Sequence, residues 1–197
     1  AESPDNPEVL DLILQMQGHL RVENYQAHAG QRFFVGNLKR HLPQFFRQCR
    51  VLELGSRDAD GSLREWFDHC QYVGVDVLPG KGVDQVVLPA HYAASSETFD
   101  TIVCCEWLEH DPLWAETLEN ARRLLKPGGL LIVAAASAGR ARHARCGQDA
   151  QAMDYYRNLG AEDIRALPGW LPHFEAHYLV EDTQSHDLLF FGLAQGA

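Results

Sequence analysis

The chain has 197 residues, of which 46% are apolar, and its formal net charge is −10 at neutral pH. This length and apolar content fit one globular domain and exclude a disordered chain. The negative charge repels phosphate backbones and anionic lipid surfaces, so it disfavours nucleic acids and membranes as partners. No apolar run approaches the ~20 residues that span a bilayer.

The N-terminal stretch and the cysteines both favour a cytoplasmic setting. AESPDNPEV has neither the basic segment nor the apolar segment of a signal peptide. The five cysteines form no CxxC pair and no regular framework, which is typical of reduced thiols. They are Cys49, Cys70, Cys104, Cys105 and Cys146.

Two helical patterns come first along the chain. One helical face comprises Val9, Leu10, Ile13, Leu14 and Gln17, after a Pro- and Asp-rich stretch of the kind that starts helices. A second pattern runs from about 31 to 42, where apolar residues recur at helical spacing until Pro43 interrupts it. We expect residues 1–48 to form an N-terminal helical cap.

Five short apolar runs follow, namely RVLELG, QYVGVD, DQVVLP, FDTIVCC and LLIVAAAS. Each has the length of a strand and is apolar on both faces, as parallel strands covered by helices are. The clearest helical pattern between them spans 112–126, with Asp111 as the expected N-cap, Pro112 at the first position and KPGG as its end. This alternation predicts an α/β fold with a mostly parallel sheet.

The end of the chain carries a different signal. HYLVED and DLLFFGLA are two strand-like runs joined by TQSH, and so short a link permits only an antiparallel pair. The parallel sheet is therefore expected to close with a C-terminal hairpin at 171–197. The preceding segment, 138–170, is the least regular part and is expected to be a lid over a ligand site.

The first predicted strand ends in LELGSRDADGS, which raises two ligand hypotheses. A calcium loop would need carboxylates where Ser56 and Phe67 stand, so calcium is disfavoured. Asp76 ends the second strand, 21 residues after Gly55, which is the spacing of a ribose-binding carboxylate in doubly wound folds. The pair favours a nucleoside-containing ligand; a ligand-free turn at Gly55 and a capping role for Asp76 are the alternatives.

Further along, FDTIVCCEWLEHDP is followed by LENARRLLKPGGLLIVAAAS. These segments resemble the fourth- and fifth-strand segments of class I S-adenosylmethionine-dependent methyltransferases, most closely the small-molecule group called methyltransferase type 11. The resemblance covers about 50–137. It implies a Rossmann-like, doubly wound sheet of seven strands, mostly parallel, whose C-terminal hairpin supplies an antiparallel strand. It also implies one domain over 1–197, with the cofactor-binding core at 49–137 and an acceptor-side lid at 138–170.

The resemblance assigns roles in binding S-adenosylmethionine, whose product is S-adenosylhomocysteine. Gly55 would let the backbone approach the methionyl part, Glu53 would orient the loop or the amino group, and Asp76 would take the ribose hydroxyls. The other implied cofactor contacts are Ser56, Arg57, Val77, Leu78, Ala90, His91, Cys105 and Glu106. Pro89 stands where many relatives carry an acidic residue, so adenine recognition would rest on backbone groups or on His91.

Methyl transfer requires acceptor, methyl and sulfur in line, and a hydroxyl acceptor also benefits from a general base. His110 is the candidate base, with a loop-fixing hydrogen bond as its alternative role, and Glu106 is a candidate catalytic or acceptor contact. The candidate acceptor residues, for which lid packing is the alternative role of the tyrosines, are His143, Tyr155, Tyr156 and Arg157. The histidines show no HExxH-like spacing, so no catalytic metal is expected.

The function that follows is transfer of a methyl group to oxygen or nitrogen of a small molecule. CCEW replaces the [DNS]PP[YFW] box of enzymes that methylate nucleobase amines, which argues against such a DNA enzyme. The alternatives are a cofactor-binding protein without catalysis and a protein or nucleic-acid methyltransferase. The oligomeric state stays open, with a homodimer as one option.

Overall fold

The computed structural model describes residues 27–58, 62–143 and 155–196. The helix expected around 9–17 lies outside these residues, as do Cys146 and part of the expected lid. The described cysteines, Cys49, Cys70, Cys104 and Cys105, are free thiols. None of the helices within the described ranges combines the length and the apolar character that a bilayer span requires.

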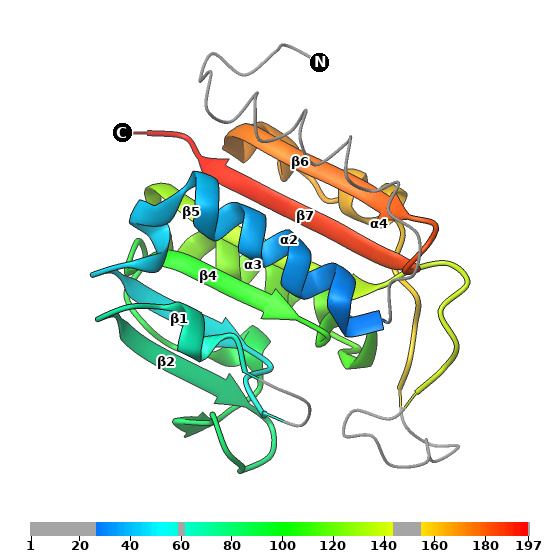
Figure 1. The fold of residues 1–197 in the computed structure, drawn as a ribbon, viewed down its shortest axis with the longest axis horizontal. Coiled ribbons are helices and arrows are strands. Elements are labelled where there is room, and N and C mark those ends of the chain that lie inside the picture. Colours follow the sequence, from blue (N-terminus) through cyan, green and yellow to red (C-terminus); the bar gives the residue numbers. More distant parts are fainter. Residues whose placement is uncertain (1–26, 59–61, 144–154, 197) are drawn as a thin grey trace.

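A seven-stranded sheet in the order β3-β2-β1-β4-β5-β7-β6 forms the centre of the fold (Figure 1). Its first five strands pair in parallel, whereas β7 pairs antiparallel with both β5 and β6. The strands are β1 (Arg50–Leu54), β2 (Gln71–Asp76), β3 (Gln85–Val86), β4 (Phe99–Cys105), β5 (Leu125–Ala136), β6 (Phe174–Asp182) and β7 (Asp187–Ala194). The predicted doubly wound sheet with an antiparallel C-terminal hairpin is therefore confirmed.

Helices cover both faces of the sheet, which explains why its strands are apolar on both sides. Helix α2 (Ala27–His41) crosses one face and α3 (Trp114–Leu124) lies behind the other (Figure 1). The short helices are η1 (Pro43–Phe46), η2 (Arg64–Trp66), η3 (Pro89–His91), η4 (Leu108–His110), α4 (Ala161–Arg165) and η5 (Leu171–His173).

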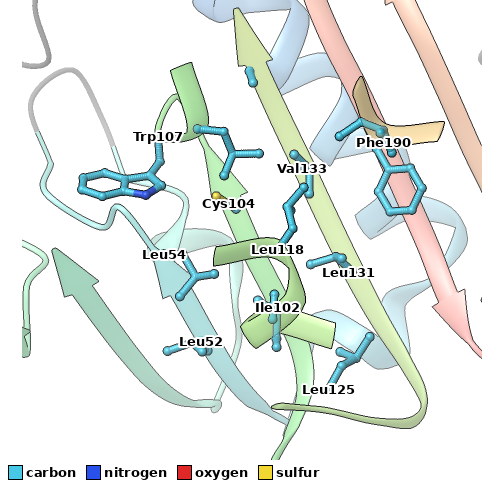
Figure 2. Close-up of a cluster of buried hydrophobic side chains, with 14 of the residues drawn as sticks. Leu52, Leu54, Ile102, Cys104, Trp107, Leu118, Leu125, Leu131, Val133 and Phe190 are labelled. Atoms are coloured by element: carbon cyan, nitrogen blue, oxygen red, sulfur yellow. The ribbon is translucent and has the colours of Figure 1, made fainter. Parts of the chain in front are cut away.

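Two apolar clusters hold these layers together. On one face, Phe34 and Leu38 of α2 pack in a cluster with Phe191 of β7. On the other face, Leu118 of α3 meets side chains of β1, β4, β5 and β7, as Figure 2 shows. Because successive strand residues point to opposite faces, Phe190 and Phe191 of β7 fall into different clusters.

The segment after β4 departs from the sequence prediction. Helix α3 begins at Trp114 with Leu113 as its N-cap, so the expected start at Pro112 with Asp111 as cap is wrong. The Asp111 carboxylate accepts hydrogen bonds from Trp107 Nε1 at 3.0 Å, Thr117 Oγ1 at 2.5 Å and the Leu113 amide at 2.8 Å. Asp111 therefore organises the whole turn between β4 and α3.

Two strand boundaries also differ from expectation. KPGG does not merely end α3, because β5 starts at Leu125, which pairs with Phe99 of β4. Strand β3 is limited to Gln85–Val86, although DQVVLP reads as a longer strand. It lies at the sheet edge next to β2, where only one neighbour supplies ladder bonds.

Candidate functional site

The parallel strands β1, β2, β4 and β5 all end at one edge of the sheet, where open α/β sheets bind ligands. The turn after β1 begins at Gly55, whose φ of +77° suits glycine. The amides of Gly55 and Ser56 both donate to the carbonyl of Val75, which anchors this turn to β2. A Cβ at Gly55 would lie 2.6 Å from the Cβ of Trp107, so the close approach in the structure is to that indole.

Asp76 ties the turn after β2 to the turn after β1. Its Oδ1 accepts from the Leu78 amide at 3.0 Å, and its Oδ2 accepts from the Arg57 amide at 3.4 Å. Only 1% of Asp76 is exposed, whereas Leu78 is 45% exposed. The carboxylate thus stands at the predicted ribose position but lies beneath the segment 56–58.

The segment 56–58 lies directly against residues 80–82. The Asp58 amide donates to the Lys81 carbonyl at 2.9 Å, and the two side chains form an ion pair at 2.6 Å. The Arg57 side chain packs on Gly80, within 3.1 Å of where a Cβ would stand. Arg57 therefore faces the turn between β2 and β3 in this conformation.

The predicted adenine-side residues, Ala90 and His91, lie in η3. Asn120 of α3 donates to the carbonyls of Pro89 and Tyr92, both at 3.0 Å, which fixes this short helix against α3. His91 is exposed, as the sequence hypothesis of a ligand contact requires.

Two buried polar atoms near the first turn lack a hydrogen-bond partner among the described residues. They are Glu53 Oε2 and Ser56 Oγ. Burial raises the pKa of Glu53 to about 7, although the Tyr72 hydroxyl beside it favours the charged form. Glu53 lies on the α2 face of β1, as its neighbour Val51 does.

A second group of polar residues gathers where β4 ends. Glu106 has a φ of +53° and accepts hydrogen bonds from Gln31 of α2 and from Arg140, the latter at 2.9 Å. Arg140 also pairs with Asp187 at the start of β7, whose side chain is fully buried. Burial raises the pKa of Asp187 to about 6, and the charge of Arg140 opposes that rise.

Next to Glu106, helix η4 presents Glu109 and His110, both buried. The imidazole of His110 lies 5.0 Å from that of His143 and 5.4 Å from the phenol ring of Tyr156, measured between ring centroids. The His143 and Tyr156 rings are 5.1 Å apart. Burial, together with the charge of Glu106, raises the pKa of Glu109 well above its usual range.

Several sequence-predicted residues thus meet at this second group, namely Glu106, His110, His143 and Tyr156. Tyr155 is exposed. The guanidinium of Arg157 pairs with Asp163 and lies over Trp114, so its contacts lie outside the ring cluster. Burial in the sheet raises the pKa of Cys105 well above its usual range. Val77 is half-buried beside Asp76.

Sequence reasoning missed five residues of this edge, namely Gln31, Trp107, Glu109, Arg140 and Asp187. Glu109 stands inside the recognised LEH stretch, so the motif offered a signal for it. Gln31, Arg140 and Asp187 come from three distant segments, and only the fold brings them to Glu106.

Comparisons with known proteins agree with this architecture. A family model described as a methyltransferase domain matches residues 25–188. The structure of Burkholderia thailandensis 1,6-didemethyltoxoflavin-N1-methyltransferase, with 1,6-didemethyltoxoflavin and S-adenosylhomocysteine, superposes with a TM-score of 0.57 and 14% identity over 99% of this chain and 93% of that one. CurJ carbon methyltransferase superposes with a TM-score of 0.58 and 16% identity over 98% and 68% of the two chains.

A curated relative matches a shorter stretch. Compactin diketide synthase mlcB of Penicillium citrinum is 38% identical over 72 residues, which are 36% of this chain but only 3% of that much longer protein. The match therefore concerns a small part of a large synthase.

Together, the sheet order, the ligand-binding edge and these likenesses define a class I S-adenosylmethionine-dependent methyltransferase. The chain belongs to the methyltransferase domain family, whose model covers most of its length.

Proposed function

We propose that this methyltransferase acts on oxygen or nitrogen of a small-molecule acceptor, which binds over Glu106, His110, His143 and Tyr156. The observation that carries the proposal is the convergence of two imidazoles and a phenol, with ring centroids 5.0–5.4 Å apart, where β4 ends. Strand β4 pairs with β1, so this cluster stands one strand away from the first cofactor turn.

The residues at the first two turns fit the polar groups of S-adenosylmethionine. The Asp76 carboxylate has acceptor capacity left for the ribose hydroxyls, because its Oδ2 holds only one long hydrogen bond. The unpartnered hydroxyl of Ser56 offers a further contact at the same turn. Because Asp76 is 1% exposed, ribose contact requires the segment 56–58 to move away from residues 80–82.

The bound cofactor supplies a methyl group on a sulfonium, a good leaving group. The protein's task is then to orient the acceptor and to accept its proton where the acceptor is a hydroxyl. His110 is suited to that task because imidazole titrates near neutral pH. The expected lid contributes His143 and Tyr156 to the ring cluster beside His110, from its described residues 138–143 and 155–157. This supports the assignment of the lid to the acceptor side.

Calorimetry with S-adenosylhomocysteine tests the cofactor half of the proposal. Asp76→Ala should weaken binding at least ~10-fold, since one lost charged hydrogen-bonding partner costs about 1.5–3 kcal/mol. Asp68→Ala is the matched control, because its exposed carboxylate pairs only loosely with Lys39 and lies near the opposite end of the strands. Unchanged affinity in a folded Asp76→Ala variant would refute the ribose assignment.

A panel of hydroxyl, amine and activated-carbon acceptors with methyl-labelled cofactor tests the acceptor half. Label in a hydroxyl or amine product that falls at least ~10-fold in His110→Ala supports the proposal. Label only in carbon products would point to the chemistry named for CurJ. Label in macromolecules, or cofactor binding without turnover, would favour the other two hypotheses.

A further inference from the structure

Glu109 is a buried carboxylate whose hydrogen bonds are not made. None of its surface is exposed, and neither Oε1 nor Oε2 has a hydrogen-bond partner of good geometry in the described part of the chain. Its own amide and that of Ala136 lie near enough to favour its charge. A buried, unpartnered carboxylate is costly, so this side chain needs a further partner.

Two histidines converge on this carboxylate. One ligand atom from each of Glu109, His110 and His143 lies within 4.8 Å of the other two. His143 Nε2 stands 3.9 Å from Glu109 Oε1 and 3.7 Å from Glu106 Oε2. The two imidazole planes are perpendicular to each other, at 90°.

The charge around the cluster also points to a cation. Three carboxyl groups, those of Glu106, Glu109 and Asp187, lie around the single guanidinium of Arg140. Arg140 bonds directly to Glu106 and Asp187, which leaves Glu109 to the histidines. A divalent ion at Glu109 would replace the proton that burial favours on this carboxyl and would stabilise its charged form.

We propose that Glu109, His110 and His143 form a binding site for a first-row divalent metal ion of the Zn²⁺ type. Two imidazole nitrogens and one carboxylate oxygen are a ligand set of catalytic zinc sites, in which a fourth position stays open. Nitrogen ligands disfavour Mg²⁺, which prefers an all-oxygen shell.

The distances between the three ligand atoms are now at most 4.8 Å. They have to shorten to ~3.3 Å, because Zn–N and Zn–O bonds are about 2.0–2.1 Å long and tetrahedrally arranged. His143 can supply this movement because its side chain is 34% exposed. Its distance of 33 residues from His110 explains why no ligand motif was visible in the sequence. The histidine spacing led us to expect no catalytic metal, and this proposal revises that expectation.

The site deepens the proposed function and rests on it for its use. With the ion bound, His110 would be a ligand, and the ion in place of a free imidazole would promote loss of the acceptor proton. An open position beside Tyr156 would take an oxygen of the acceptor and lower the pKa of an acceptor hydroxyl. Binding of the ion itself does not depend on that role.

Metal binding to the full chain, stripped with a chelator, is measured with Zn²⁺ alone in competition against a chromophoric chelator. One equivalent should bind. Glu109→Gln and His143→Ala should each weaken Zn²⁺ binding at least ~100-fold. Removing a residue that only hydrogen-bonds to a metal ligand typically costs ~10–100-fold in affinity. His177→Ala is the matched control, because that exposed histidine lies on β6. Co²⁺ should show the visible absorption of a four-coordinate nitrogen and oxygen site.

No binding to the wild-type chain, or equal binding by wild type and His143→Ala, would overturn the site. His143 is partly exposed, unlike the fully buried Glu109, so its variant decides the matter even where Glu109→Gln does not fold. Affinity for S-adenosylhomocysteine is measured on the same variants. Lost Zn²⁺ binding with retained cofactor affinity supports the metal site, whereas failure of Asp76→Ala to alter cofactor binding bears only on the proposed function.

Discussion

Gly55 shows how a single residue shapes the edge of the sheet where the cofactor site is proposed. Its φ of +77° is strained for any side chain, and Trp107 fills the space where a Cβ would stand. Gly55→Ala should therefore add overpacking of ~1–3 kcal/mol to backbone strain of at least ~1 kcal/mol. Urea unfolding followed by circular dichroism measures the loss, and affinity for S-adenosylhomocysteine should fall with it.

Gly128 separates these two costs. Its φ is +69°, yet no atom lies within 4 Å of where its Cβ would stand. Gly128→Ala should cost only the strain. Equal losses in the two alanine variants would show that the contact with Trp107 does not constrain Gly55.

At this scale the sequence allowed some residues of the site to be predicted. Gly55 follows one strand and Asp76 ends the next, at a known spacing, so their positions could be inferred from the chain alone. Arg57 could not be assigned, because its direction depends on how residues 56–58 meet the glycines of the next turn. Glu109 was overlooked because its burial is a property of the folded turn.

At the scale of elements, Arg140 joins three segments of the candidate acceptor site. It pairs with Glu106 after β4 and Asp187 in β7, and its side chain is 11% exposed. Arg140→Met should destabilise the fold by about 3–5 kcal/mol, because it leaves the fully buried carboxylate of Asp187 and the partly buried one of Glu106 without their cation. Thermal or urea unfolding measures this.

Arg165→Met provides the control for Arg140→Met. That arginine pairs with Glu162 one turn away on α4, and both side chains are largely exposed. Such pairs contribute ~0–0.5 kcal/mol. A loss of similar size in both variants would mean that Arg140 does not hold the segments together.

Elements were predictable where local pattern and burial agree. The limits of FDTIVCC match β4 because the run is apolar and β4 is paired on both sides. The start of α3 was mispredicted because Asp111 has competing partners in Trp107 and Thr117, which no local pattern reveals. The ring cluster formed by His110, His143 and Tyr156 depends on contacts between distant segments and so was predicted only as separate candidates.

For the whole molecule, buried acids should set the pH dependence of stability. The folded-state pKa values of Glu53 and Asp187 are raised to about 7 and about 6 because both groups are buried. An acid whose pKa is higher in the folded state makes its full contribution to stability below its pKa in the unfolded chain. That contribution is lost as the pH rises through its pKa in the folded state. Salt bridges lower the pKa values of Asp100 and Glu119, whose smaller contributions are instead lost as pH falls through the acid range.

The protein should therefore be more stable near pH 5 than near pH 8. Glu53→Gln cannot ionise, so it should remove much of this decline and make the fold more stable at pH 8, by up to about 3 kcal/mol. Near pH 4.5 the variant should resemble the wild type. Urea midpoints across this range measure the difference, at ~0.5 M salt so that the repulsion of the net charge of −10 is screened. Glu162→Gln is the control, because this side chain is exposed, and it should leave the pH profile of stability unchanged. Parallel profiles for the wild type and Glu53→Gln would contradict the prediction, because they would show that Glu53 ionises as readily in the folded chain as in the unfolded one.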